Sequence, residues 1–270
     1  MATSDSLIQV KNLKKHYHRG AIKALDGVTA DINKGDVMVV IGPSGSGKST
    51  FLRSLNLLEE PTDGEIIFNG VDITKKKYKD ASGKTVKLDI DGLRQKMGMV
   101  FQHFNLFPHM TILENMSIAE NKGKPFNLTR GVNKAHIDYY REMLAHLNLG
   151  LEDKMHTPVG ALSGGQRQAV ALLMATMTPI DFLILDEHTA ALDPKTAEII
   201  MQLTDQVVRE KKVTTIMVTH NLRYAVEYGS RLLMMHEGKV ILDKTGEEKK
   251  NVDTEEIMKI FNQISVECGN

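Results

Sequence analysis

The chain has 270 residues, of which 41% are hydrophobic and 25% charged, which is ordinary for a globular protein and enough for one α/β domain with a smaller inserted subdomain. Lysine plus arginine and aspartate plus glutamate both number 34, and this balance argues against a nucleic-acid binder, because such proteins usually carry a basic excess or stripe. The single cysteine, Cys268, excludes an intrachain disulfide framework and a CxxC metal or redox pair, and fits a reducing compartment.

Strand-like and helix-like runs alternate along the chain. Apolar runs predict strands at residues 7–10, 37–41, 65–69, 96–101, 182–185, 214–218 and 231–236. Amphipathic patterns predict helices at residues 48–58, 137–147, 165–177, 194–210 and 221–228. Residues 38–41, 182–185 and 216–218 are apolar at every position, which is typical of strands buried on both faces of a parallel sheet.

The helical patterns are concentrated in one part of the chain. Residues 111–177 contain long helices and no strand signal, so we expect a helical subdomain inserted there into an α/β core of about residues 1–110 and 178–270. Residues 75–91 are polar, lysine-rich and contain a Ser-Gly turn signal, which predicts a solvated loop or hairpin.

No segment has the features of a signal peptide or a membrane span. Residues 1–9 are polar and lack an apolar core, and no apolar run approaches the roughly 20 residues that a spanning helix needs. If the protein acts at a membrane, we expect other chains to supply the membrane-spanning part.

A glycine-rich loop follows the predicted strand at 37–41. Its segment 42–49 reads GPSGSGKS and matches the GxxxxGK[ST] pattern of phosphate-binding loops. Glycine lets the backbone approach phosphates closely, and the helix N-terminus that follows favours an anion. Lysine would supply a positive charge to the β- and γ-phosphates, and the serine after it would bind Mg²⁺. The predicted nucleotide-contacting residues are Gly42, Ser44, Gly45, Gly47, Lys48, Ser49 and Thr50. The alternative, a glycine-rich turn without a ligand, is disfavoured by the strand and helix on either side.

Two carboxylates, Asp186 and Glu187, stand at the end of the predicted strand at 182–185. An aspartate at the carboxyl end of a strand beside such a loop can hold Mg²⁺ through water. The next carboxylate can then polarise the attacking water as a general base. We therefore expect Asp186 to be a metal ligand and Glu187 the catalytic base; the alternative is a strand that simply meets solvent at these residues.

The segment 162–168 reads LSGGQRQ. LSGGQ is the signature of ABC (ATP-binding cassette) ATPases, which the chain resembles here. Because this loop opens a helix, Ser163 and the amides of the two glycines would form an anion-binding terminus. The resemblance implies that Ser163, Gly165 and Gln166 contact the γ-phosphate of ATP held by a partner subunit. It also implies an α/β P-loop NTPase core with an antiparallel N-terminal β part and an inserted helical subdomain.

Other elements of the resemblance follow in the expected order over nearly the whole chain. Tyr17 matches the aromatic residue that stacks on adenine, although alone it would be interpreted as a packing tyrosine. Gln102 matches the glutamine that senses Mg²⁺ and links to the membrane partner. Asp193 matches the loop that crosses the dimer interface, and His220 matches the switch histidine at the γ-phosphate. The implied catalytic residues are Glu187, His220 and Gln102, and the implied metal ligands are Ser49, Gln102 and Asp186.

His188 departs from the family pattern, which has proline or alanine after the catalytic glutamate. A titratable ring beside Glu187 could perturb the pKa of that carboxylate. The alternative is a ring that packs or points to solvent.

The two halves of the chain resemble different branches of the family. Segments 54–59 (SLNLLE) and 101–111 (FQHFNLFPHMT) resemble ATPases of polar amino-acid importers. Segments 147–153, 186–197 and 246–251 resemble a less defined branch of bacterial importer ATPases. The join would lie between about residues 111 and 122, so the chain is either a chimera of natural or engineered origin or an ordinary member between the branches.

The resemblance implies an ATP-hydrolysing subunit of an ABC transporter that uses ATP and Mg²⁺ and imports amino acids. Two copies, or one copy and a paired ABC subunit, would sandwich two ATP molecules head to tail. Closure and reopening would drive integral-membrane permease subunits, served indirectly by a substrate-binding protein. The chain would then lie peripherally at the cytoplasmic face of a bacterial cell membrane, without a nucleic-acid partner.

Three alternatives remain open. An exporter or lipoprotein-release ATPase shares all of the chemistry. A soluble ABC ATPase of translation or DNA repair usually carries two cassettes or long coiled coils, which this chain lacks. A P-loop nucleotide kinase has no need of LSGGQ or of the histidine switch.

Overall fold

The structure is a computed structural model that describes residues 6–79, 82–121 and 134–267. Cys268, residues 1–5 of the polar N-terminal segment and residue 122 at the limit of the expected join lie outside the described residues.

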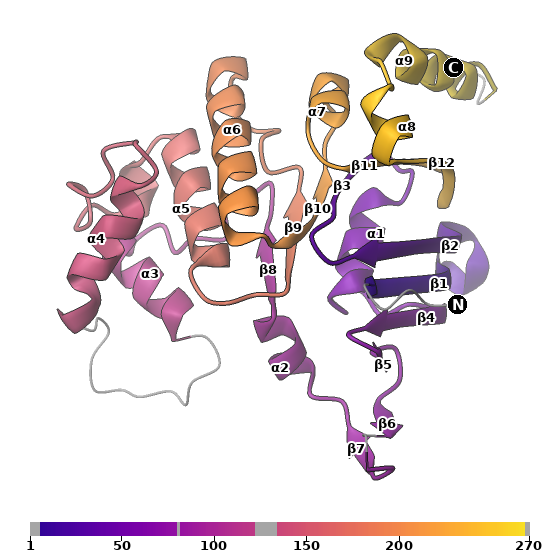
Figure 1. The fold of residues 1–270 in the computed structure, drawn as a ribbon, viewed down its shortest axis with the longest axis horizontal. Coiled ribbons are helices and arrows are strands. Elements are labelled where there is room, and N and C mark those ends of the chain that lie inside the picture. Colours follow the sequence, from indigo (N-terminus) through magenta and orange to yellow (C-terminus); the bar gives the residue numbers. More distant parts are fainter. Residues whose placement is uncertain (1–5, 80–81, 122–133, 268–270) are drawn as a thin grey trace. The chain divides into compact units, whose positions relative to one another are not determined.

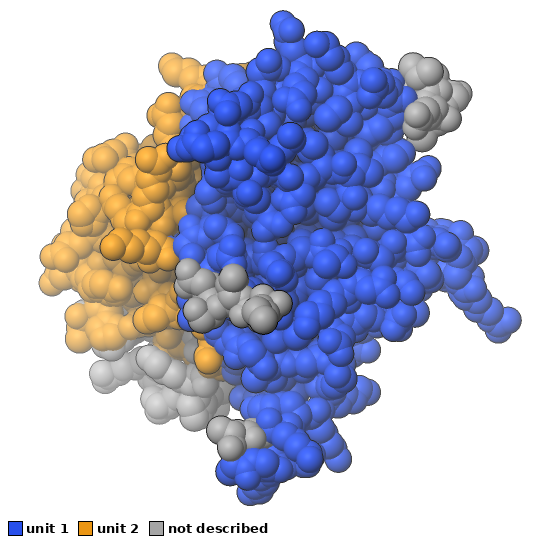
Figure 2. All heavy atoms as spheres, turned by 45° about the vertical axis from the view of Figure 1, so that its right-hand side comes forward, with its two compact units in different colours: residues 1–93, 213–270 blue, residues 94–212 orange. Residues whose placement is uncertain are grey.

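The chain divides into two compact units, shown in Figure 2. Unit 1 contains residues 1–93 and 213–270, and unit 2 contains residues 94–212. Among the helices that the structure describes, none combines the length and the apolar character required to cross a bilayer.

One part of unit 1 is an antiparallel sheet with the strand order β2-β1-β4-β5 (Figure 1). Its strands are β1 (Ser6–Tyr17), β2 (Ile22–Asn33), β4 (Asp63–Phe68) and β5 (Val71–Asp72). Along β2, Val28, Ala30 and Ile32 are buried while the residues between them are exposed. This period of two places one face of the sheet in the core.

The other part of unit 1 is built on parallel strands. β3 (Val37–Ile41) pairs with β10 (Thr214–Val218) and with β11 (Arg231–His236), and β12 (Lys239–Thr245) adds antiparallel to β11. The helices that begin in unit 1 are α1 (Lys48–Leu55), α2 (Ile90–Gln95), α7 (Leu222–Glu227), α8 (Gly246–Lys250) and α9 (Thr254–Glu267). The carboxyl ends of β3 and β10 meet at one edge, so the segments that follow them are neighbours.

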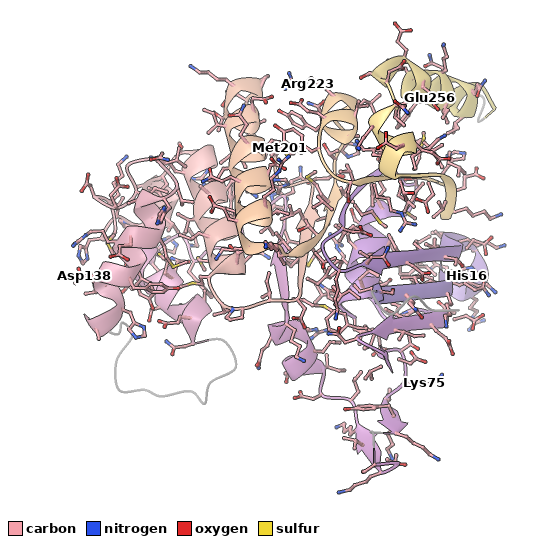
Figure 3. All side chains as sticks on the ribbon, viewed as in Figure 1. His16, Lys75, Asp138, Met201, Arg223 and Glu256 are labelled. Carbon is pink, nitrogen blue, oxygen red and sulfur yellow. The ribbon has the colours of Figure 1, made fainter. Side chains whose placement is uncertain are left out.

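A short hairpin of β6 (Lys77–Lys79) and β7 (Thr85–Lys87) follows the antiparallel sheet. Lys75, labelled in Figure 3, precedes this hairpin and pairs with Asp72 at 2.7 Å and with Glu65 at 3.1 Å. Of the two predicted forms for residues 75–91, loop or hairpin, the structure has the hairpin, with residues 80 and 81 outside the described part.

Unit 2 has two parallel strands and four α-helices among its described residues. β8 (Met97–Val100) pairs with β9 (Phe182–Asp186), which is buried at all five positions. The helices are α3 (Ile112–Glu120), α4 (Ile137–Ala145), α5 (Gly164–Thr176) and α6 (Pro194–Lys211), with 3₁₀ turns at Lys134–His136 and Val159–Ala161. Residues 111–177, expected to form a helical subdomain, supply α3, α4 and α5.

The predicted strands and helices are all present, and the predicted fold class, an α/β core with an antiparallel part, is confirmed. The helix predicted at 48–58 ends at Leu55, because Leu57 adopts a left-handed conformation with φ of 56°. The elements that the sequence patterns missed include β2, β12, α3 and α9.

Candidate active site

The loop between β3 and α1 is shaped by close backbone contacts within unit 1. Gly42 has a φ of +150°, and a Cβ atom there would lie 2.1 Å from the carbonyl oxygen of Met235 on β11. Gly47 stands at the N-cap of α1 with a φ of 100°, and no side chain caps the helix. A helix N-terminus without a side-chain cap presents backbone donors and a positive dipole end to an anion.

Lys48 is the first residue of α1 and is only 5% exposed. Its ammonium donates hydrogen bonds to the carbonyl oxygens of Gly42, at 2.9 Å, and of Pro43, at 2.8 Å. These two bonds hold the positive charge of Lys48 against the backbone of the loop between β3 and α1. The Ser46 hydroxyl is buried without a hydrogen-bond partner among the described residues. A fixed cation, an uncapped helix end and an unsatisfied hydroxyl together suit a phosphate chain.

Two further predicted residues belong to unit 1. Tyr17 is the last residue of β1 and is half-buried, and His220 follows β10 and is exposed. The backbone on the C-terminal side of His220 is fixed by Asn221, whose amide donates to the Thr219 hydroxyl at 3.1 Å. The Asn221 side chain caps α7 by accepting from Arg223 N at 3.0 Å. Unit 1 therefore contains Tyr17, the 42–50 loop and His220.

In unit 2 the strand β9 ends at the two predicted carboxylates. Asp186 is its last residue and is 5% exposed. Glu187 follows with a φ of 52°, in the left-handed region that non-glycine residues seldom adopt. Such strained residues persist only where their surroundings enforce them, and they are concentrated at functional sites.

His188 is buried in unit 2, at 2% exposure, and packs against α6. The Thr204 hydroxyl donates to the carbonyl of Ile200 at 2.7 Å, so Nε2 of His188, 3.1 Å from that hydroxyl, must be the donor. Burial lowers the pKa of His188 from 6.5 to about 4. The ring is therefore neutral at physiological pH, which supports the packing alternative and gives no positive charge beside Glu187.

The signature segment forms the N-terminus of α5. The Ser163 hydroxyl accepts a hydrogen bond from Gln166 N at 3.2 Å, and the Gln166 side chain accepts from Ser163 N at 3.2 Å. Gly165 is buried, and a Cβ there would lie 2.4 Å from Cγ2 of Thr196 on α6. Asp193 caps α6 by accepting from Thr196 N at 3.1 Å, and the Thr196 side chain, followed by this backbone bond, lowers the pKa of the Asp193 carboxyl. Each of these residues thus has a structural role inside its own chain.

Gln102 follows β8 and is exposed. Nearby in the sequence, Phe104 packs under the guanidinium of Arg167 from α5, 4.8 Å from the ring centroid. Arg167 also donates to the carbonyl of Leu162 at 2.9 Å. Arg167 therefore connects the segment that contains Gln102 to the backbone that precedes Ser163. The sequence analysis did not predict this role, although Arg167 belongs to the LSGGQRQ segment.

A magnesium site made only of protein side chains is not found in the described part of the chain. No three His, Cys, Asp or Glu side chains gather there in a position to hold a metal. The predicted set of a serine hydroxyl, a glutamine amide and a carboxylate fits the usual Mg²⁺ arrangement, in which one or two carboxylates act together with nucleotide phosphates and water.

Comparison with known proteins identifies the family. The family model described as ABC transporter matches residues 25–190. The tyrosine transport ATP-binding protein of Clostridioides difficile (strain R20291) is 38% identical over 261 residues, which cover 94% of this chain and 98% of the relative. This chain belongs to the ABC transporter family.

Two further relatives support the same ABC assignment. The arginine transport ATP-binding protein ArtM of Bacillus subtilis (strain 168) is 38% identical over 242 residues, covering 90% of this chain and 92% of the relative. A dimeric ATP-binding cassette solved in a post-hydrolysis state with ADP and Pi has a TM-score of 0.71 and 32% identity, covering 88% of this chain and 98% of the solved one. As a member of this family, the protein is an ATP-hydrolysing enzyme.

The ABC residues predicted from the sequence are divided between the two units. Unit 1 holds Tyr17, Gly42, Ser44, Gly45, Gly47, Lys48, Ser49, Thr50 and His220, and unit 2 holds Gln102, Ser163, Gly165, Gln166, Asp186, Glu187 and Asp193. Besides Arg167, sequence reasoning missed Lys15 and Glu59, which contact the Tyr17 side chain. No local signal marks this pair, because the two residues are far apart in the sequence.

Proposed function

We propose that two copies of this ABC ATPase, or one copy and a paired cassette, close on two ATP molecules and so energise amino-acid import through a membrane permease. The relatives named for tyrosine and arginine transport support the substrate class. Tyrosine and arginine differ in their side chains and share the α-amino and α-carboxyl groups, so the class is α-amino acids. A substrate-binding protein would deliver the solute, and the ATPase would lie at the cytoplasmic face of the membrane.

The observation that carries this proposal is the α1 terminus with its buried cation. Lys48 is held by two loop carbonyls and places its charge at the uncapped start of the helix. There it would bind the β- and γ-phosphates of ATP, while the amides of the loop orient them. Tyr17 would stack on adenine.

The remaining residues have proposed roles in hydrolysis. Ser49, Gln102 and Asp186 would hold Mg²⁺, which neutralises the phosphate charge. Glu187 would accept a proton from the attacking water, an effect worth about 10²- to 10⁴-fold in rate. His220 would contact the γ-phosphate. Ser163, Gly165 and Gln166 of the second copy would complete the site, with Asp193 near the interface between copies.

The test is purification of the tagged chain with its membrane partner, followed by reconstitution in proteoliposomes. We expect a co-purifying permease and ATP-dependent uptake of radiolabelled amino acids in the presence of the binding protein. Glu187→Gln is the matched control, because it should bind ATP and support no uptake. ATP-driven efflux of an apolar solute would show that the protein serves an exporter and not an importer. Purification without any membrane subunit would favour a soluble ABC ATPase.

A further inference from the structure

A three-residue cluster surrounds the end of β1 in unit 1. The Lys15 ammonium lies 5.0 Å from the centroid of the Tyr17 ring. The same ammonium pairs with Oε1 of Glu59 at 3.0 Å and donates to the carbonyl oxygen of Glu60 at 2.7 Å. Glu59 follows α1 in the sequence, so the cluster joins the antiparallel sheet to the segment after the phosphate-binding helix.

This cation is held in place more firmly than an ordinary surface lysine. The Lys15 side chain is 15% exposed and that of Glu59 is 27% exposed, so water screens their attraction only in part. With two oxygen acceptors engaged, the ammonium stays over one face of the ring. A cation in this position is attracted to the ring electrons and leaves the opposite face for another partner.

The hydroxyl end of the ring has polar neighbours of its own. The Glu59 carboxylate and the Thr50 hydroxyl both lie near the Tyr17 hydroxyl and interact with it electrostatically. Burial, followed by the interaction with Glu59, raises the pKa of Tyr17, and the ion pair with Lys15 is the largest cause that lowers the pKa of Glu59. Because Thr50 lies in the first turn of α1, the Tyr17 hydroxyl lies near the helix that carries Lys48.

We propose that Lys15 and Glu59 are nucleobase-positioning residues, which hold the Tyr17 ring so that one face stacks on the purine of the bound nucleotide. The inference rests on the proposed adenine contact of Tyr17 and adds the residues that make it effective. A ring already held at one face by the Lys15 ammonium loses less conformational entropy when the base binds. The cation behind the ring also draws electron density from it, which favours stacking with an electron-rich purine on the other side.

The neighbouring strand residues offer a matched control. Lys14, one position earlier on β1, makes an ion pair with Asp63 at 3.3 Å, and its side chain is 32% exposed. His16, labelled on the antiparallel sheet in Figure 3, lies 3.3 Å from Asp26. The cation that lies over the Tyr17 ring is that of Lys15, so replacing Lys14 removes a charge from the same strand and leaves this cation–π contact in place.

The experiment compares two ligands that share a phosphate chain and differ in the base. Calorimetric titrations of the full chain with MgATP and with magnesium tripolyphosphate are made for Lys15→Met, Glu59→Gln and the control Lys14→Met. We expect Lys15→Met and Glu59→Gln to weaken MgATP binding by about 3- to 10-fold, the size of a cation–π contact, and to leave tripolyphosphate binding unchanged. Lys14→Met should change neither.

Tyr17→Ala separates this inference from the proposed function. It should weaken MgATP alone, and adding Lys15→Met to it should cause no further loss, because the ring through which Lys15 acts is gone. Equal weakening of both ligands by Glu59→Gln and Lys15→Met would show a structural role and overturn the inference, as would unchanged MgATP affinity. If Tyr17→Ala itself spares MgATP, the proposed adenine contact is wrong.

Discussion

The helices α1 and α5 both start after glycine-containing loops, but their first turns are completed in different ways. α1 begins after Gly47, has no side-chain cap and carries the buried cation of Lys48. α5 begins with a reciprocal pair of bonds between Ser163 and Gln166. One terminus is therefore charged and uncapped, and the other is neutral and satisfied by its own chain.

This difference has a consequence for the order of binding. A serine hydroxyl has one donor and two acceptor positions, so Ser163 can accept from Gln166 and still donate its proton to a phosphate oxygen. The α5 terminus offers only neutral donors, whereas α1 adds an ammonium, and charge-assisted hydrogen bonds are about twice as strong as neutral ones. We infer that ATP binds first at α1, and that the α5 terminus of a second copy joins a site already loaded.

The largest effect should come from removing the cation of α1. Lys48→Ala should weaken MgATP binding by about 30- to 150-fold, since a hydrogen bond to a charged group contributes about 2–3 kcal/mol. Hydrolysis should fall below detection. Titration calorimetry with MgATP measures the affinity, and the exposed Lys34→Ala provides the control. Unchanged affinity in Lys48→Ala would remove the basis for treating α1 as the primary site.

At α5 we expect a change in assembly and none in affinity. Ser163→Arg should keep the MgATP affinity of the isolated chain and block ATP-driven dimerisation, because the bulky cation would stand at an exposed position that we propose faces the partner. Light scattering with MgATP measures the dimer. A Ser163→Arg protein that still dimerises would show that this loop does not face the second nucleotide.

A mixture of the two variants sharpens the comparison. In a mixed dimer of Lys48→Ala and Ser163→Arg, one composite site carries both changes and the other carries neither. Hydrolysis above that of either variant alone is expected if one intact site can turn over. The steady-state rate as a function of mixing ratio measures this return, and a rate that only averages the two parents would contradict the composite site.

Substitution of Gly165 tests why a glycine stands at the start of α5: because of the close approach of α6, or because of contact with a ligand. Gly165→Ala should lower the free energy of unfolding by about 1–3 kcal/mol, because the new Cβ would lie 2.4 Å from Cγ2 of Thr196. Thr196→Ser removes that methyl group, so the double variant should recover most of the stability. Urea unfolding measures both. No recovery in the double variant would mean that the glycine is required for another reason.

The sequence predicted the residues of α1 and α5 because each set is contiguous and its chemistry is local. Residues 42–49 could be assigned from the spacing of the GxxxxGK[ST] pattern, and residues 162–168 from their resemblance to the ABC signature. The Lys15–Glu59 pair could not, because only the fold brings together residues so distant along the chain. The strand β2 was missed although Val28, Ala30 and Ile32 alternate with polar residues. Neither the burial of His188 nor the left-handed Glu187 has a local signature, since both depend on how β9 packs.

The smallest expected effect is a pH dependence of stability that arises in unit 2, where His188 is buried, and not at α1 in unit 1. The folded-state pKa of His188 is lowered from 6.5 to about 4, so between these values the unfolded chain binds the additional proton. Stability from this group is therefore present above pH 6.5 and is lost as the pH falls toward 4, with about 1–2 kcal/mol lost between pH 7 and pH 5. Phosphate binding at α1 does not involve His188 and should persist over this range. His188→Asn cannot titrate and can still donate to Thr204, so its unfolding midpoint should depend less on pH than that of the parent. Denaturant unfolding at pH 5 and pH 7 measures the difference. An equal change of the unfolding free energy with pH in parent and variant would show that protonation of His188 does not destabilise the protein.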